Sequence, residues 1–109
     1  LYIGVEGAKE TAKYMTITFK CTKECQINQP ASVHVDLTAR PQLVSEEDNP
    51  SFYNILKKYH KMTGNPSILN TSFNVHEEPI VFTPADAIKS FIDCDIDLLA
   101  IENFLVSKN

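Results

Sequence analysis

Two Pro residues, each preceded by a residue that caps helices, constrain the fold of this chain more than any other feature. The first pair is Asn49-Pro50, where Pro takes the favoured first position of a helix. Acidic residues at 46–48 precede it, near the positive end of the helix dipole. Gly64 is a typical helix stop. The sequence predicts a helix from Pro50 to Gly64 with one apolar stripe, formed by Phe52, Ile55, Leu56, Tyr59 and Met62.

The second pair is Thr83-Pro84, and it carries an additional capping signal. Asp86 stands at the third helical position, where its carboxylate and Thr83 form a capping-box-like pair. The acidic stretch 93–95 ends the apolar periodicity. The sequence therefore predicts a second helix that begins at Pro84, with a buried side formed by Ala87, Ile88, Phe91 and Ile92.

The remaining apolar runs are short and predict strands. About six short strands with mixed directions are expected around the two main helices. Gly4 and Gly7 argue against a stable element in residues 1–12, and residues 20–30 are polar and typical of a loop. The prediction is a single α/β domain over 1–109 with a poorly defined start at 1–12. Strands are expected at 14–19, 33–36, 42–44, 67–69, 80–82, 98–101 and 104–106.

Composition limits the class of protein. The chain has 109 residues and a net charge of −4, which argues against a nucleic-acid-binding surface. It has no apolar run of membrane-spanning length, and we expect no signal peptide. Leu1 is not an initiator Met, so we expect a piece of a longer cytoplasmic protein that ends in a true domain C-terminus after the last strand pair.

The cysteines, histidines and clustered aspartates do not have the spacing of a metal site. Cys21 and Cys25 form a C-x3-C pair, and the three His residues are scattered without zinc-finger spacing. The aspartates at 93, 95 and 97 lack EF-hand spacing. The odd cysteine count fits a reducing compartment. We expect free thiols at Cys21, Cys25 and Cys94 and no metal bound to this chain.

The stretch Ile68 to Val75 combines an apolar start with small polar side chains. Two readings stay open for the polar part. It could be a simple turn after a buried strand, because Asn, Ser and Thr bond to their own backbone. The alternative is that it binds a phosphate, carbonyl or sugar hydroxyl at the end of a strand. The binding reading rests on Asn70, Thr71, Ser72 and Asn74.

A second polar group follows the expected strand at 33–36. Asp36, Thr38 and Arg40 place a carboxylate, a hydroxyl and a guanidinium within five residues. Arg40 is suited to bidentate binding of phosphate, whereas Lys would act only as a point charge. The alternative is a solvent-exposed ion pair between Asp36 and Arg40.

Together these segments resemble the C-terminal signature of the O-carbamoyltransferase family, which includes nodulation-type and antibiotic-tailoring enzymes. The resemblance runs from about Tyr14 to Val106 and includes the family's His-Val-Asp-x-Thr-Ala-Arg run at 34–40. Two departures stand out: Pro41 replaces an apolar residue, and His76-Glu77 replaces an Arg-Gly pair. The residues that carry the resemblance are Asp36, Thr38-Ala39-Arg40, Glu47-Asp48-Asn49-Pro50, Phe52-Tyr53, Thr63-Gly64, Leu69 to Val75, Glu78-Pro79-Ile80-Val81, Pro84 and Asp86-Ala87.

The resemblance implies a YrdC-like fold, a twisted sheet in an α/β domain, with a nucleotide site. It implies a first reaction in which carbamoyl phosphate and ATP, with Mg²⁺, give carbamoyl adenylate. It makes Arg40 the catalytic cation and gives Thr38 and His76 substrate-binding roles. It also assigns nucleotide or substrate binding to Asn70, Thr71, Ser72 and Asn74. We expect Asn70, Ser72 and Asn74 to share one pocket wall with Arg40.

The resemblance places the rest of the reaction outside this chain. It implies an N-terminal domain of actin-like ATPase fold that binds the metal of the transfer step and the acceptor hydroxyl. Basic residues of the nucleotide site are also expected upstream of Leu1. Because only Arg40 and His76 are available as cations near the motif, we expect this chain alone to be inactive. A non-catalytic nucleotide-binding or assembly module is the alternative, and a homodimer stays open.

Overall fold

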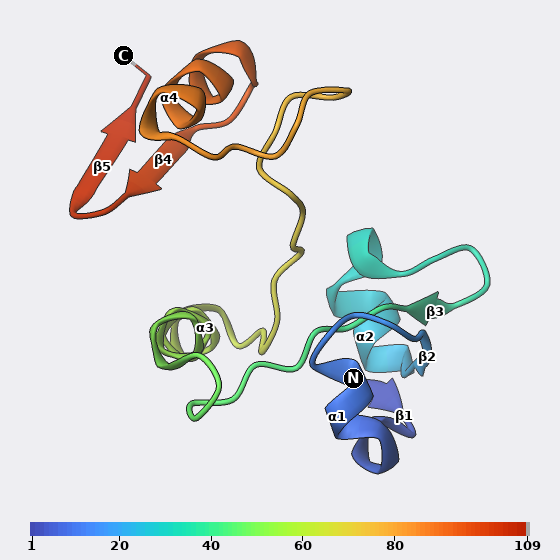
Figure 1. The fold of residues 1–109 in the computed structure, drawn as a ribbon. Helices are drawn as coiled ribbons and strands as arrows, with labels where there is room; N and C mark the ends of the chain where they lie inside the picture. Colours follow the sequence, from blue (N-terminus) through green and yellow to red (C-terminus); the bar gives the residue numbers. More distant parts are fainter. Residues whose placement is uncertain (109) are drawn as a thin grey trace. The chain divides into compact units, whose positions relative to one another are not determined.

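The computed structural model describes residues 1–108, and the chain divides into two compact units. Unit 1 comprises residues 1–69, and unit 2 begins at residue 70. Both contain helices and strands, which confirms the predicted α/β class (Figure 1). Unit 1 has a sheet of three strands in the order β1-β2-β3, and unit 2 has the pair β4-β5. All these pairs are antiparallel, where the sequence had led us to expect mixed directions.

The sheet of unit 1 is built from very short strands. These are β1 (Tyr2–Ile3), β2 (Phe19–Cys21) and β3 (Thr38–Ala39). β2 is the central strand, and Phe19 pairs with Ala39 across the sheet. A small core forms where Cys21, Cys25 and Ala39 pack together with the partly buried Leu1, Tyr2 and Val33.

Two segments expected to be irregular are helical. Residues 1–12 contain β1, the 3-10 helix η1 (Val5–Ala8) and the helix α1 (Lys9–Ala12). The expected loop at 20–30 contains α2 (Lys23–Asn28) and the start of the 3-10 helix η2 (Pro30–Ser32). Those predictions were wrong. The Thr22 hydroxyl accepts a bond from the Cys25 amide at 3.2 Å and caps α2, so a polar sequence gains a buried face.

Three strands predicted in unit 1, two of them from alternating side chains, do not form. The segment 14–19 turns instead, because Met15 takes a left-handed φ of 55°, and only Phe19 enters a strand. Residues 33–36 belong to a turn that precedes β3, and residues 42–44 have no strand. Alternating side chains over a few residues were not sufficient to form a strand here, because no neighbouring strand pairs with these segments.

The long helix of unit 1 confirms the first capping prediction. α3 spans Pro50–Thr63, and the Asn49 side chain accepts a bond from the Phe52 amide at 3.1 Å. Gly64 follows with a left-handed φ of 78°, which suits Gly because it lacks a Cβ. None of the residues of α3 is fully buried, and its stripe residues Ile55 and Met62 are exposed.

Unit 2 confirms the predicted helix and strand pair. α4 spans Pro84–Asp93 with a complete capping box between Thr83 and Asp86. The buried side was predicted in part wrongly: Ala87 and Phe91 are buried, but Ile88 and Ile92 are 51% and 65% exposed. The helix packs with the narrower face formed by Ala87, Ser90 and Phe91. It is followed by β4 (Leu98–Ile101) and β5 (Phe104–Ser107). The core of this unit contains Ala87, Phe91 and Leu99, with Phe73, Val81, Ile96 and Ile101 packed around them.

The strands predicted at 67–69 and 80–82 do not form. Residues 65–82 contain no helix or strand, although the Val81 amide donates to the Phe73 carbonyl at 3.0 Å. Leu69 is 67% exposed, so the buried strand expected to lead into the polar stretch was also wrong. The apolar run had suggested burial, but in unit 1 nothing packs over its end.

Candidate functional site

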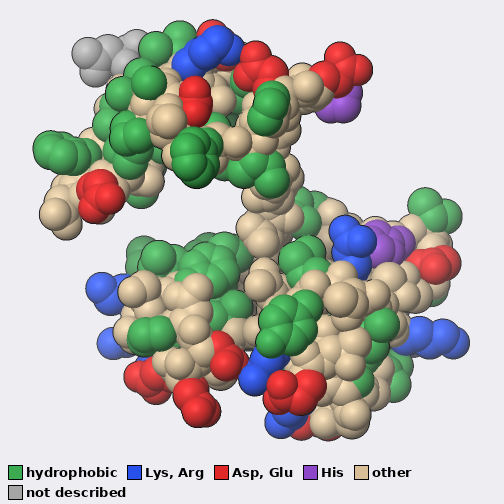
Figure 2. All heavy atoms as spheres, viewed as in Figure 1, with side chains coloured by type: hydrophobic (Ala, Val, Ile, Leu, Met, Phe, Trp, Pro, Cys, Tyr) green, Lys and Arg blue, Asp and Glu red, His purple; other side chains and the backbone are tan. Residues whose placement is uncertain are grey.

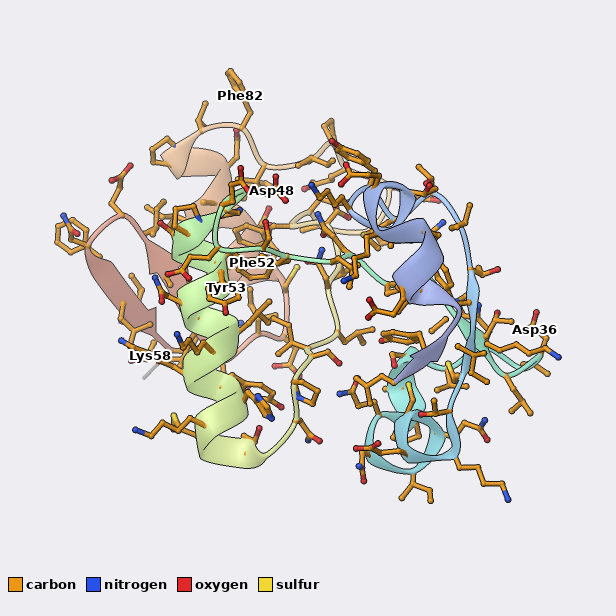
Figure 3. The ribbon with its side chains drawn as sticks, turned by 90° about the horizontal axis from the view of Figure 1, so that it is seen from below. Asp36, Asp48, Phe52, Tyr53, Lys58 and Phe82 are labelled. Carbon is orange, nitrogen blue, oxygen red and sulfur yellow. The ribbon has the colours of Figure 1, made fainter. Side chains whose placement is uncertain are left out.

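The loop between Val33 and β3 forms a closed turn that positions the first group of predicted site residues. The His34 amide donates to the Thr38 carbonyl at 2.7 Å, and the Leu37 amide donates to the His34 carbonyl at 2.9 Å. Leu37 has a left-handed φ of 65°, which reverses the chain. Asp36 lies at the outer end of this loop (Figure 3).

A chain of three side chains holds the loop. Asp36 Oδ1 accepts two bonds from Thr38, from the amide at 3.0 Å and from the hydroxyl at 2.7 Å. His34 Nδ1 lies 3.1 Å from the same hydroxyl oxygen. Because the only hydroxyl proton goes to Asp36, the Thr38 oxygen accepts from His34 Nδ1–H. The bonds from Thr38 lower the pKa of the Asp36 carboxyl below its usual range.

Arg40 follows this loop directly, between two buried residues. Ala39 and Pro41 are both buried, whereas Arg40 is exposed. The alternative of an Asp36–Arg40 ion pair was wrong, since the residues that the structure describes contain no such pair and Asp36 bonds Thr38 instead. Pro41, the departure from the family pattern, is buried next to β3. The Arg40 guanidinium is therefore available to an anion.

The second group of predicted residues lies in unit 2. Asn70, Thr71 and Ser72 are exposed, and Asn74 is half-buried. Asn74 Nδ2 donates to the carbonyls of Val75 at 3.0 Å and Glu78 at 3.1 Å. Both amide protons of Asn74 thus shape the following turn, and a ligand would meet the Asn74 side chain at its oxygen.

The turn at 75–78 contains the His76-Glu77 departure. The Glu78 amide donates to the Val75 carbonyl at 3.0 Å, which closes a four-residue turn. Glu77 takes a φ of 67° at the third position of this turn. That position of a type II turn favours Gly, so this chain places a glutamate where the backbone prefers the family's Gly. His76 is exposed beside it.

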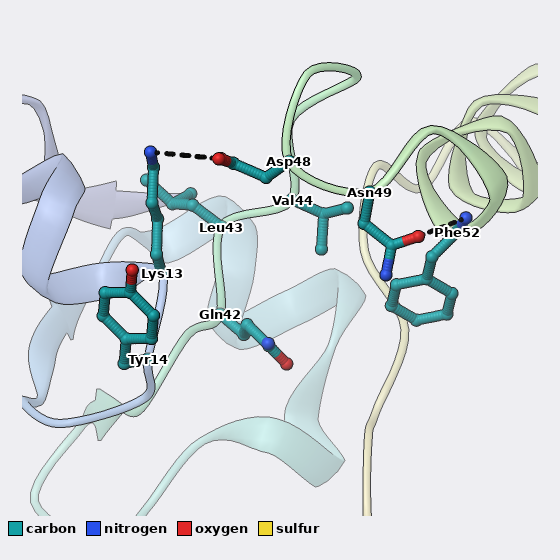
Figure 4. A pocket seen from close by; sticks show the side chains of 8 residues that line it. All are labelled: Lys13, Tyr14, Gln42, Leu43, Val44, Asp48, Asn49 and Phe52. Atoms are coloured by element: carbon teal, nitrogen blue, oxygen red, sulfur yellow. Dashed lines mark hydrogen bonds and ion pairs between the residues drawn. The ribbon is translucent and has the colours of Figure 1, made fainter.

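Unit 1 also contains a shallow pocket of about 370 Å³, shown in Figure 4. Lys13 lies at its edge and is held by Asp48 at 3.1 Å and Glu10 at 3.2 Å. These two carboxylates raise the pKa of Lys13, and Asp48 has the larger effect. The pocket's only cation is thus already neutralised. The lining residues are Lys13, Tyr14, Gln42, Leu43, Val44, Asp48, Asn49 and Phe52.

Lys89 on α4 is in the same situation in unit 2. Its ammonium lies 3.0 Å from Glu78 and 3.1 Å from Asp93, and these two carboxylates raise the pKa of Lys89. The sequence analysis missed both lysines and the role of His34. The His34-x-Asp36-x-Thr38 spacing was a usable signal for His34, but no local signal links Lys13 to Asp48.

The predicted site residues fall in both units. Thr38 and Arg40 lie two residues apart in unit 1, and the polar stretch from Asn70 to His76 lies in unit 2. The pocket wall shared by Arg40 and this stretch stays a prediction.

Residues 1–108 bring together no three His, Cys, Asp or Glu side chains that could hold a metal ion. Cys21, Cys25 and Cys94 are free thiols. No helix within this range is long and apolar enough to cross a membrane.

The chain belongs to the carbamoyltransferase C-terminus family, whose family model matches residues 4–108. An uncharacterised protein of Methanocaldococcus jannaschii is 50% identical over 96 residues, which are 88% of this chain and 16% of that protein. The nodulation protein NolO of Bradyrhizobium diazoefficiens is 46% identical over 78 residues, or 72% of this chain and 14% of its own length. NolNO of Sinorhizobium fredii is 44% identical over 78 residues, with 12% of its length covered. The chain thus spans less than a fifth of these relatives.

Proposed function

We propose that this chain is the C-terminal part of a carbamoyltransferase that makes carbamoyl adenylate and passes the carbamoyl group to a hydroxyl acceptor. The observation that carries the proposal is the family match over nearly the whole chain, from residue 4 to 108. The acceptor would bind in an N-terminal domain of the longer protein, which is consistent with the small share of each relative that the chain spans. We place the reaction in the cytoplasm, where ATP is supplied.

The proposed carbamoyl transfer has three steps. Carbamoyl phosphate loses its phosphate to water and leaves carbamate and inorganic phosphate. A carbamate oxygen then attacks the α-phosphorus of ATP, and pyrophosphate leaves from the adenylate. Finally the acceptor oxygen attacks the carbamoyl carbon, its proton is lost, and AMP leaves. Mg²⁺ bound to ATP would offset part of the phosphate charge.

The residues of this chain contribute charge and positioning to these steps. Arg40 would bind phosphate oxygens through its guanidinium, because bidentate bonds suit a phosphate and the group makes no competing ion pair among residues 1–108. Thr38 would hold the loop beside it through Asp36. Stabilisation of developing charge by fixed donors is the main catalytic contribution expected of such a site.

Unit 2 would supply neutral contacts to the nucleotide and the carbamoyl group. Asn70, Thr71 and Ser72 offer exposed amide and hydroxyl groups, and Asn74 offers its side-chain oxygen. His76 would add a donor when protonated, in place of the family's Arg.

This chain alone is expected to bind ATP weakly and to form no product. Each of Lys13 and Lys89 is held by two carboxylates, so neither adds free positive charge. Arg40 would then have to offset the negative charge of both ATP and carbamoyl phosphate, which is too much for one cation. The same observation favours the second candidate, a non-catalytic nucleotide-binding or assembly module.

Calorimetry with Mg–ATP and carbamoyl phosphate tests the proposal on this chain and on an N-terminally extended version of the protein. The extended protein should release pyrophosphate, and AMP once an acceptor hydroxyl is supplied, whereas the short chain should release neither. Micromolar binding by the short chain would show that its pocket is complete. Binding without turnover by the extended protein would favour the non-catalytic module.

Arg40→Ala in the extended protein tests the role of the cation. It should lower pyrophosphate release by roughly 100-fold, the scale expected for loss of one stabilising donor. Lys58→Ala, which removes an exposed cation from α3 (Figure 3), is the matched control and should leave the rate unchanged. Equal rates for both variants would remove Arg40 from the reaction.

A further inference from the structure

The three-stranded sheet of unit 1 has one covered face and one open face. On the covered face, Phe19, Cys21 and Ala39 are at most 8% exposed, and Cys25 of α2 packs with the last two. Successive side chains of a strand point to opposite faces, so Lys20 of β2 lies on the open face, and it is exposed. The open face is therefore where the charged side chain of the central strand meets solvent.

The strand register places Lys20 beside Thr38. The two residues are direct partners in the antiparallel pair of β2 and β3. The Cys21 amide donates to the Leu37 carbonyl at 2.9 Å, so the backbone bonds are exchanged by the flanking residues and not by Lys20 and Thr38 themselves. Side chains of such a non-hydrogen-bonded pair are the closer kind in an antiparallel sheet. The Lys20 and Thr38 side chains thus project from the open face as neighbours.

Arg40 belongs to the same open face. It is exposed between the buried Ala39 and Pro41, so the alternation of the strand continues beyond β3. Arg40 stands two residues after Thr38 and shares its face, which makes it the diagonal neighbour of Lys20. Long side chains span such a diagonal. In Figure 2, Lys or Arg side chains and a His side chain lie on the surface around β3.

Both cations of this face keep their charge free. Within residues 1–108, neither Lys20 nor Arg40 takes part in an ion pair, whereas several other lysines are held by carboxylates. Asp36, the carboxylate of the loop before β3, already accepts two bonds from Thr38. The two cations outnumber this carboxylate, so the open face favours an anion.

We propose that Lys20 is a second phosphate-binding cation, which acts together with Arg40 on one phosphate group at the open face of the sheet. The inference rests on the proposed function, and it assigns the phosphate of carbamoyl phosphate to this face. A guanidinium binds two phosphate oxygens as a fork, and an ammonium adds a point charge on a flexible stem. Together they match the charge of a single phosphate group.

The second cation does not make the short chain sufficient for the reaction. Lys20 and Arg40 suit one phosphate group, whereas ATP brings three more and normally requires Mg²⁺ and further cations. Lys20 lies outside the segments that carry the family resemblance, so its role follows from the strand register alone.

Titration of the 109-residue chain with inorganic phosphate, followed by NMR at constant ionic strength, tests the site. The backbone amides of Lys20 and Arg40 should shift on binding. Lys20→Ala should weaken binding roughly fivefold, the scale of one exposed charge contact, and Lys20→Arg should retain it. Lys23→Ala is the matched control, because it removes an exposed lysine from α2, the helix on the covered face, and should bind like wild type.

Three results of this titration overturn the proposal. They are a chain that binds no phosphate, a Lys20→Ala variant that binds as tightly as wild type, and an equal loss in Lys23→Ala. The last result would mean that phosphate is attracted to surface lysines in general. Far-UV circular dichroism confirms that each variant is folded.

Kinetics of the N-terminally extended protein separate this proposal from the proposed function. Lys20→Ala should raise the KM for carbamoyl phosphate roughly fivefold and leave the KM for ATP unchanged. An unchanged KM for carbamoyl phosphate in an active protein would reject Lys20 and leave the carbamoyltransferase function standing. If the extended protein releases no pyrophosphate, the proposed function fails, and the phosphate titration alone decides whether Lys20 and Arg40 form an anion site.

Discussion

Replacing Glu77 by Gly should stabilise unit 2. Glu77 is held at a φ of 67° in the turn at 75–78, which is closed by the bond from the Glu78 amide to the Val75 carbonyl. Asn74 holds the same turn by donating to the carbonyls of Val75 and Glu78. The surrounding bonds keep the left-handed backbone in place, so the strain falls on the glutamate.

The size of the effect follows from two opposing terms. The left-handed conformation costs a residue with a Cβ roughly 1–2 kcal/mol, and Gly avoids this cost. Gly also makes the unfolded chain more flexible, which offsets about 0.5–1 kcal/mol. The net gain in unfolding free energy should be about 0.5–1 kcal/mol, or a rise in melting temperature of about 3 °C.

Urea unfolding can assign the gain to unit 2. All four tyrosines lie in residues 1–69 and the chain has no Trp, so tyrosine fluorescence reports unit 1 alone. Amide hydrogen exchange at Cys94, whose N–H bonds the Ser90 carbonyl at 2.9 Å, reports α4 in unit 2. Slower exchange at Cys94 in the Gly variant is the expected result.

Glu77→Ala separates backbone strain from charge. Alanine removes the carboxylate but keeps the Cβ, so it should not reproduce the gain. A Gly variant no more stable than wild type would refute the strain argument. An equal gain with Ala would refute it as well, since the carboxylate would then be the cause.

Two further results are expected. Thr38→Val should raise the pKa of Asp36 towards its usual value, measured by NMR titration, whereas Thr38→Ser should keep it low. Because the pKa of Asp36 is lower in the folded chain, the stability that Asp36 contributes is fully present above the unfolded pKa of about 3.9. That stability is lost as the pH falls through the folded pKa. The Val variant should therefore lose less unfolding free energy on acidification. In thiol titration of the folded chain, Cys94 should react before Cys21 and Cys25, because Cys21 and Cys25 are both buried. Burial and the hydrogen bond to Cys25 also raise the pKa of Cys21 to about 11. Early reaction of Cys21, or an unchanged Asp36 titration in the Val variant, would contradict these expectations.

The sequence alone determined those elements whose start and end signals lie within a few residues of the element. Asn49-Pro50 with Gly64, and Thr83-Pro84 with Asp86, predicted α3 and α4 with their caps. The hairpin β4-β5 followed from two apolar runs joined by a tight turn. Each of these signals acts within a few residues, so the chain does not need a distant partner to obey it.

The N-terminal elements depended on contacts that no local pattern records. The alternation at 14–19 predicted a strand, but Met15 turns there and the sheet forms from Phe19 with β1 and β3. The polar stretch at 20–30 forms α2 because Cys25 is buried in the unit 1 core. Pairing partners decide whether a short periodic segment becomes a strand.

The candidate site divides in the same way. Residue chemistry and the family pattern identified Thr38, Arg40 and the polar stretch at 70–76. Only the tertiary structure revealed that His34 and Asp36 hold Thr38, and that carboxylates neutralise Lys13. Hydrogen bonds and ion pairs depend on distances between side chains, and for partners far apart in the chain, such as Lys13 and Asp48, those distances are set by how the backbone folds.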